Sequence, residues 1–175
     1  GFTEFAGVRF IAPDPYWYHT TDQGTSLAPR AFLGSVRYIA KRDNLGRWGT
    51  LGANGTTVNG IIRDMAYLNG TVFVVGDFGS VAGTAAPFIA RIDHQTGVVG
   101  TLSGGSVSCL AGTTVQTIAA APWGSVYFGG GVSELAGTNT RMIGQWNGNF
   151  GTLTNGTVND VVEDLYLNRG GTLVA

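Results

Sequence analysis

Residues 71–102 read TVFVVGDFGSVAGTAAPFIARIDHQTGVVGTL, and this stretch decides the fold. It ends in Gly-Thr-Leu at 100–102, and the same tripeptide stands at equal distances on either side, at 49–51 and 151–153. An apolar run that ends in Asp or Asn precedes each copy, at 38–43, 88–93 and 142–147. Recurrence at a fixed spacing predicts an internal structural repeat.

Two further landmarks accompany the tripeptide. Val-Gly-Asp-Phe at 75–78, followed by Ala-Gly-Thr at 82–84, has its counterpart at 129–132 and 136–138. A third apolar run recurs at 58–62, 115–119 and 158–162. The residues that we expect to form the turns and strand ends of the repeat are Asp43, Trp48, Gly76, Gly83, Asp93, Gly130 and Gly137. Glycine suits such positions because it tolerates positive φ and close packing of the backbone.

Each repeat predicts four short strands, which in the clearest copy cover residues 58–65, 71–75, 88–93 and 98–102. Asn69-Gly70 separates the first two, and this dipeptide is a strong hairpin signal because both turn residues must take positive φ. The strand at 71–75 is rich in β-branched and aromatic residues. We find no sustained apolar stripe of helical period, so the sequence predicts an all-β fold.

Composition excludes several classes of protein. Of 175 residues 29 are glycine, and only 12% are charged, with a net charge of -1. The glycines do not recur at every third position, which excludes collagen. Basic residues do not outnumber acidic ones, which argues against nucleic acid as a partner. No apolar run is long enough for a membrane span. The first and last residues both resemble cuts within a longer protein, and Cys109 is expected to be a small buried hydrophobe.

The repeat resembles the kelch family of β-propellers. Its glycine cluster at 129–131 follows an apolar run at 125–128, as at a kelch strand end, and residues 92–97 are similar to the kelch turn. The resemblance implies a partial propeller of four-stranded blades over residues 33–175, an incomplete set of about three repeats. The missing blades would come from residues beyond the sequence or from other copies. A β-sandwich or a solenoid is the alternative.

Residues 1–32 are expected to lie outside this repeat. Residues 9–18 resemble a segment of the distal tail protein family of long-tailed bacteriophages. That resemblance implies that 1–19 end a β-rich tail-type domain, that 20–32 form a linker, and that the protein sits in a virion tail. The implied partners are other tail proteins and further copies in a ring. Tyr16, Trp17 and Tyr18 are the binding candidates, although an aromatic plug closing a sheet also explains them.

No converging catalytic set is visible in the sequence. His19 and His94 lack a pattern of partners, and we predict no catalytic residue, metal or cofactor. Glycosidases need two close carboxylates. The acidic candidates, which are scattered, are Asp64, Asp77, Glu134, Asp160, Glu163 and Asp164.

The resulting prediction is a non-enzymatic structural and binding component of a phage-like tail. Its propeller would display loops that attach to a host-surface glycan or protein. The alternatives are a secreted or surface-anchored bacterial propeller that binds or processes carbohydrate, and a bacterial adhesin without a phage connection.

Overall fold

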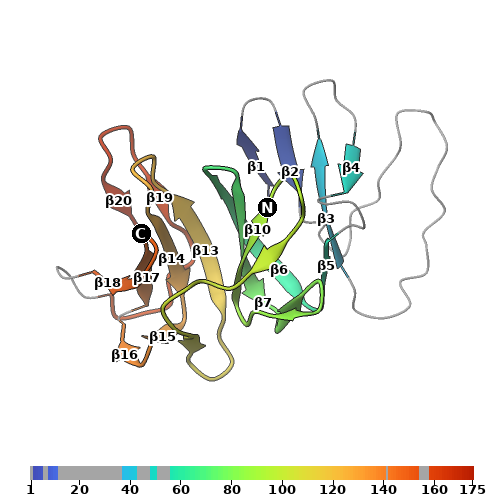
Figure 1. The fold of residues 1–175 in the computed structure, drawn as a ribbon. Helices are drawn as coiled ribbons and strands as arrows, with labels where there is room; N and C mark the ends of the chain where they lie inside the picture. The colour runs from blue at the N-terminus through green and yellow to red at the C-terminus, as the bar shows by residue number, and fades with distance from the viewer. Residues whose placement is uncertain are drawn as a thin grey trace.

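The computed structural model describes residues 2–5, 8–11, 37–42, 48–50, 56–140, 142–153 and 158–175. These residues form an all-β fold without a helix, as the sequence predicts (Figure 1). The sheets are open, and the described part of the chain forms no closed ring. It accordingly contains no helix that could cross a membrane.

The second unit of the chain is the clearest. The strands β6 (Ile61–Leu68), β7 (Thr71–Asp77), β10 (Ile89–Asp93) and β11 (Val99–Gly100) pair antiparallel in this order. The structure therefore confirms the predicted strands at 71–75 and 88–93 with small differences at their ends, whereas the strand predicted at 98–102 is reduced to Val99–Gly100. Asn69 and Gly70 have φ values of 47° and 81° and close the β6–β7 hairpin, as their turn chemistry requires.

The predicted strand at 58–65 is instead two strands in different sheets. β5 (Thr56–Val58) ends before a bend, and β6 begins after it. The bend is fixed because Oδ1 of Asn59 accepts the backbone N–H groups of Gly79 at 2.9 Å and Ser80 at 2.8 Å. Gly60 follows where any Cβ would overlap the carbonyl oxygen of Asp77. β5 then pairs with β3 (Arg37–Arg42) and with β8 (Ser80–Val81), and β8 pairs with β9 (Thr84–Ala85).

The third unit repeats the second in strand order and register. It contains β13 (Val115–Ala120), β14 (Val126–Gly130), β17 (Ile143–Trp146) and β18 (Phe150–Thr152). Its small side sheet contains β12 (Val107–Cys109), β15 (Val132–Leu135) and β16 (Thr138–Asn139). Phe128 opposes Gly144 just as Val74 opposes Ala90 in the second unit.

Backbone dihedral angles repeat along with the register. The φ values of Ala82 and Ala136 are 47° and 50°, and those of Phe88 and Met142 are 66° and 67°. The φ values of equivalent glycines agree equally well. They are 157° at Gly76 and 149° at Gly130. At Gly83 and Gly137 they are 79° and 77°. Positive φ is uncommon in non-glycine residues, so its recurrence at equivalent positions shows that the two units share one backbone design.

The first unit begins at residue 2, which differs from the expectation that residues 1–32 lie outside the repeat. β1 (Phe2–Phe5) and β2 (Val8–Ile11) continue through β3 to β4 (Trp48–Thr50) in the same antiparallel order. Arg9 opposes Arg42 and Phe10 opposes Lys41. These pairs match Val72 with Ile92 and Phe73 with Arg91 in the second unit.

The first unit is hard to recognise in the sequence because the connection between β2 and β3 is long. In the later units the step from the second strand to the third runs from Val74 to Ala90 and from Phe128 to Gly144. In the first unit the equivalent step runs from Ile11 to Ala40, which is nearly twice as far along the chain. The predicted linker at 20–32 lies in this connection, outside the described residues.

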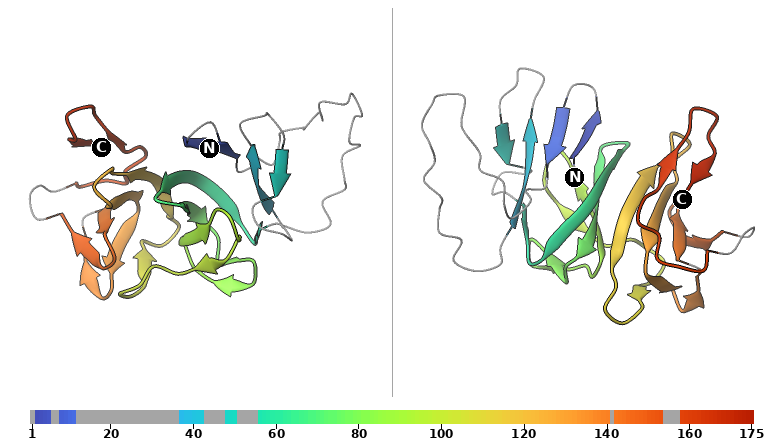
Figure 2. Two further views of the ribbon diagram at one scale, coloured as in Figure 1. Left: turned by 45° about the horizontal axis from the view of Figure 1, so that its top comes forward. Right: turned by 180° about the vertical axis from the view of Figure 1, so that it is seen from behind.

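The fourth unit contains only two described strands, β19 (Tyr166–Leu167) and β20 (Leu173–Val174), which pair antiparallel. Their hairpin is closed by Asn168, whose Oδ1 accepts the N–H groups of Gly170 and Thr172, both at 2.9 Å. The first strands of successive units lie beside one another: β1 contacts β6, β6 contacts β13, and β13 contacts β19 (Figure 2).

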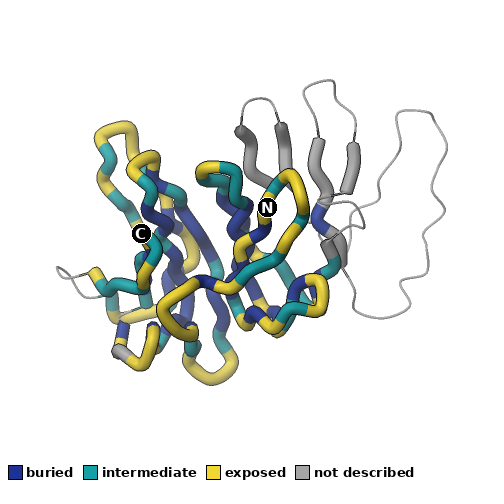
Figure 3. The backbone as a smooth tube through the Cα atoms, in the orientation of Figure 1, coloured by how far each residue is buried: buried dark blue, intermediate teal, exposed yellow. Residues whose placement is uncertain are grey.

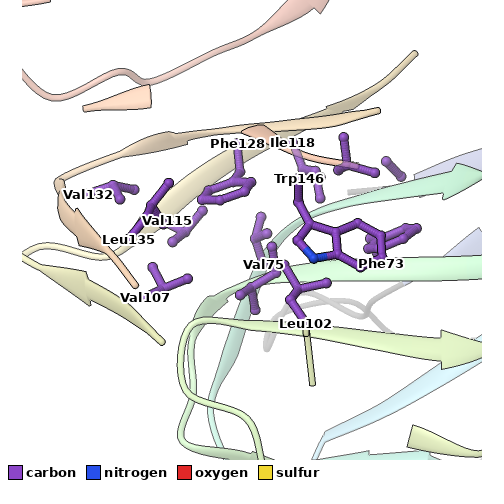
Figure 4. Close-up of a cluster of buried hydrophobic side chains, with 13 residues drawn as sticks. Phe73, Val75, Leu102, Val107, Val115, Ile118, Phe128, Val132, Leu135 and Trp146 are labelled. Atoms are coloured by element: carbon purple, nitrogen blue, oxygen red, sulfur yellow. The ribbon is translucent and has the colours of Figure 1, made fainter. Parts of the chain in front are cut away.

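The hydrophobic core lies between successive units, with exposed residues concentrated at the turns (Figure 3). Alternation along β7 sends Val72 and Val74 into one cluster and Phe73 and Val75 into the next. In the second cluster the ring centroids of Phe73, in the second unit, and Trp146, in the third, are 5.8 Å apart (Figure 4). Each sheet is therefore stabilised mainly by its neighbours, as in other repeat proteins.

Candidate functional site

Several of the predicted site residues lie outside the described part of the chain. These are Tyr16, Trp17, Tyr18, His19 and Asp43. Trp48 is the first residue of β4, where its backbone pairs with Arg42. The binding role predicted for the aromatic segment stays a prediction.

Among the other predicted repeat residues, Gly83 and Gly137 lie in turns, whereas Gly76, Asp93 and Gly130 lie at or next to the last residue of a strand. Oδ1 of Asp93 accepts the N–H groups of Gln95 at 3.0 Å and Thr96 at 2.7 Å, and it also accepts the Thr96 hydroxyl at 2.8 Å. These hydrogen bonds to Thr96 and Gln95 lower the pKa of the Asp93 carboxyl. Nδ1 of His94 lies 2.8 Å from the Gly70 carbonyl oxygen. Asp93 thus stabilises the β10–β11 turn from within, and His94 contacts the β6–β7 hairpin.

A row of polar side chains runs through three successive units, with one member in β6, one in β13 and one two residues before β19. It consists of Asp64, Thr117 and Asp164, each of which stands one residue before a buried apolar residue: Met65, Ile118 and Leu165. Oδ2 of Asp64 accepts the backbone N–H of Ile118, in the next unit, at 2.9 Å. Its other carboxylate oxygen, Oδ1, accepts the N–H of Met65 at 2.8 Å.

The same connection recurs one unit further on. Oγ1 of Thr117 accepts the backbone N–H of Leu165, in the fourth unit, at 3.0 Å. The Thr117 hydroxyl lies 3.3 Å from Oδ2 of Asp64 and 3.4 Å from Oδ1 of Asp164, so its single hydrogen faces two carboxylates. Equivalent positions therefore hold successive units together by one repeated side-chain-to-backbone hydrogen bond. We refer to Asp64, Thr117 and Asp164 as the polar row.

The electrostatics of the polar row indicate a structural role. Burial raises the pKa of the Asp64 carboxyl, and its hydrogen bonds to Ile118, Met65 and Thr117 oppose that shift. A raised pKa is one signature of a general acid. Here, however, both oxygens of Asp64 accept hydrogen bonds from the protein itself. The described residues also contain no group of three or more His, Cys, Asp or Glu side chains that could hold a metal ion.

Of the six acidic candidates, the structure brings Asp64 and Asp164 to the same hydroxyl group. Asp160 accepts the N–H of its own neighbour Val161 at 2.7 Å. The sequence does not single out Thr117, because a hydroxyl stands here where the neighbouring units have a carboxylate. The signal that could have revealed it is its place directly before the apolar residue Ile118, which matches Met65 after Asp64.

Further hydrogen bonds cross between the second and third units. The buried Thr114 hydroxyl donates to the Gly76 carbonyl oxygen at 2.6 Å. The indole Nε1 of Trp146 donates to the Ser103 carbonyl oxygen at 3.0 Å, and the Ser103 hydroxyl donates to Gly148 at 2.7 Å. In the described part of the chain every buried side-chain nitrogen and oxygen atom has a hydrogen-bond partner. The contact between units is thus polar at its edges and apolar at its centre.

One exposed aromatic side chain stands at the hairpin ends. Trp123 lies in the turn between β13 and β14 and is 54% exposed. An edge of its ring lies against Gly171 in the β19–β20 hairpin, where a Cβ would come within 3.2 Å of it. Glycine at 171 has φ +79° and leaves room for the ring. Trp123 therefore bridges two neighbouring hairpins while presenting about half of its surface to solvent.

Cys109 is expected to react slowly as a nucleophile. Cys109 is only half-buried, although the sequence predicts a buried residue. This partial burial, together with the nearby negative charge of Asp77, raises its pKa from 9.0 to about 11. Since the thiolate is the reactive form, its share at pH 8 should be roughly 100-fold below that of an unperturbed thiol. Iodoacetamide should alkylate the folded chain at least that much more slowly than the urea-unfolded chain. Equal rates would show that the thiol is neither buried nor close to Asp77.

Comparison of the chain with protein-family models, curated proteins and solved structures finds no match.

Proposed function

We propose that the chain is part of a β-propeller built from kelch-like, four-stranded blades. Three units with the same antiparallel order and register support this proposal. It is also supported by first strands that follow one another side by side, as the innermost strands of propeller blades do. On this view the polar row follows the innermost strands. The hairpins β8–β9 and β15–β16 lie in the connections between second and third strands, whereas β5 and β12 precede the first strands of their units.

We further propose that the protein is a non-enzymatic structural and binding component that displays its loops for attachment to a cell-surface glycan or protein. The observation that carries this proposal is Trp123, a half-exposed indole supported by a second hairpin. Exposed tryptophan combines a large apolar face with an N–H donor, which suits both sugars and protein surfaces. Each carboxylate of the polar row, in contrast, accepts at least one backbone N–H group of the protein.

A location in a phage-like tail is the narrower proposal. It depends on the resemblance of residues 9–18 to distal tail proteins. Residues 9–11 also serve as part of β2, so the repeat itself accounts for this part of the segment. The support that is specific to a tail therefore comes from the Pro-Asp-Pro and aromatic residues at 13–18.

Binding to bacterial cells and to an array of bacterial surface glycans tests the display function. The fluorescently labelled chain should bind at least one of these surfaces, and Trp123→Ala should reduce binding about tenfold. Val98→Ala is the matched control, since Val98 is an exposed apolar residue at a different turn and is 67% exposed. Equal binding by Trp123→Ala and the unchanged chain would overturn the assignment. Hydrolysis of a glycan on the array would favour the carbohydrate-processing alternative.

A further inference from the structure

The exposed ring of Trp123 borders a hairpin that carries a positive charge. Trp123 belongs to the third unit, which has described strands of the second and fourth units on either side, and its turn and the β19–β20 hairpin extend on the same side of the molecule (Figure 1). A Cβ at Gly171 would lie 3.2 Å from the ring atoms Cη2 and Cζ3, which form the edge farthest from the five-membered ring. The indole N–H thus lies away from this contact, and within the described residues it donates no hydrogen bond.

The hairpin beside Trp123 is held in shape by Asn168. The backbone N–H of Asn168 donates to the Thr172 carbonyl oxygen at 3.0 Å, and its carbonyl oxygen accepts the N–H of Gly171 at 2.9 Å. The side-chain Oδ1 accepts the N–H groups of Gly170 and Thr172. Among the described residues the side-chain Nδ2 has no acceptor, and Asn168 is exposed. Asn168 therefore presents an N–H donor on a turn whose shape is fixed before any ligand binds.

Arg169 supplies the charge of this hairpin. It is exposed and stands two residues before Gly171, so the Cα atoms of the two residues lie within about 7 Å of each other. In the described part of the chain Arg169 makes no ion pair. The turns at 121–125 and 168–172 read APWGS and NRGGT, and neither contains an acidic residue. The two turns together therefore carry a net positive charge and N–H donors beside an exposed aromatic ring.

We propose that Trp123, Asn168 and Arg169 form a binding site for a sugar that carries an anionic group. The sugar ring stacks on the exposed indole face, and the Arg169 guanidinium pairs with the anionic group while Nδ2 of Asn168 donates to an oxygen atom. A guanidinium suits a carboxylate or a phosphate because its N–H groups can bind two oxygen atoms at once. This inference rests on the proposed display function and narrows its ligand to acidic glycans.

Binding of an oligogalacturonide and of its carboxyl-reduced, neutral counterpart tests the site. The unchanged chain should bind the acidic form about fivefold more tightly, as one exposed ion pair allows. Added salt should diminish this preference, because it screens exposed charges. A phosphorylated mannose oligosaccharide and its dephosphorylated form show whether phosphate can take the place of carboxylate. Equal binding of each acidic probe and its neutral counterpart, or no binding of any probe, would overturn the inference.

Variants show which side chain causes the preference. Arg169→Gln should abolish it and leave binding of the neutral probe unchanged. Arg91→Gln makes the same change at an exposed arginine of β10 and should retain the preference. Trp123→Ala should weaken binding of both forms, since stacking does not require the charge. A preference that survives Arg169→Gln would contradict the site.

The two proposals fail in different ways. Equal binding of acidic and neutral glycans that still requires Trp123 would overturn this inference and leave the display function standing. Binding that Trp123→Ala does not change would overturn both. Far-ultraviolet circular dichroism verifies that each variant is folded.

Discussion

Gly130→Ala should lower the free energy of unfolding by about 3 kcal/mol. Gly130 has φ +149°, and a Cβ there would overlap the Thr114 carbonyl oxygen and lie 2.7 Å from the Gln116 nitrogen. Both atoms belong to the backbone at the start of β13 and so cannot rotate away. Relief would require the β13–β14 ladder to shift. Urea denaturation of the two chains measures the difference.

Gly137→Ala is the matched control for that substitution. Gly137 has φ +77°, and a Cβ there would meet no atom within 4 Å. Only the backbone strain of a left-handed alanine remains, which costs about 1 kcal/mol. Equal losses in the two variants would mean that the close approach of Gly130 to β13 does not exist in solution.

Asp64→Ala should destabilise the fold by about 2 kcal/mol. It deprives the N–H groups of Met65 and Ile118 of their acceptor, and each unsatisfied buried donor costs about 1–3 kcal/mol. Relief from burying the carboxylate, which raises the Asp64 pKa, offsets part of that loss. Thermal unfolding at neutral pH, followed by circular dichroism, measures the effect.

Asp160→Ala provides the comparison for Asp64→Ala. Asp160 is exposed, and its carboxylate bonds only to the adjacent N–H of Val161 among the described residues. We expect a change below about 0.5 kcal/mol, as at other surface positions. If Asp64→Ala were equally mild, the polar row would contribute little to the contact between units.

The sequence predicts the second and third units because their turns are specified locally. Asn69-Gly70 requires a tight hairpin, and the Ala-Gly pairs at 82–83 and 136–137 adopt the same positive φ in both copies. The strand at 58–65 was predicted as one because an apolar run gives no sign of a change of sheet. The side-chain bonds of Asn59 to residues 79 and 80 impose that change, and they depend on tertiary structure.

The first unit and Thr117 escaped prediction for two different reasons. The long connection between β2 and β3 displaces β1 and β2 from the regular spacing. Thr117 stands at the regular spacing, but it is a threonine where the equivalent residues are aspartates. A search for recurring aspartates therefore does not find it. Side chains that compensate one another in volume also make the repeat harder to recognise in the sequence. Phe128 faces Gly144, whereas the equivalent Val74 faces Ala90. A Cβ on Gly144 would come within 2.6 Å of the Phe128 ring. Packing constrains the combined volume of the two facing side chains, so that each one can vary if the other compensates.

The described chain consists of successive copies of one unit, and β1 (Phe2–Phe5) is the first strand of the earliest copy. Cross-strand nuclear Overhauser effects in the isotope-labelled chain show whether β1–β4 form such a copy. We predict backbone contacts between Arg9 and Arg42 and between Phe10 and Lys41, equivalent to those between Val72 and Ile92 and between Phe73 and Arg91. The second-unit contacts serve as the internal standard. Their presence without the contacts of Arg9 and Phe10 would contradict the claim.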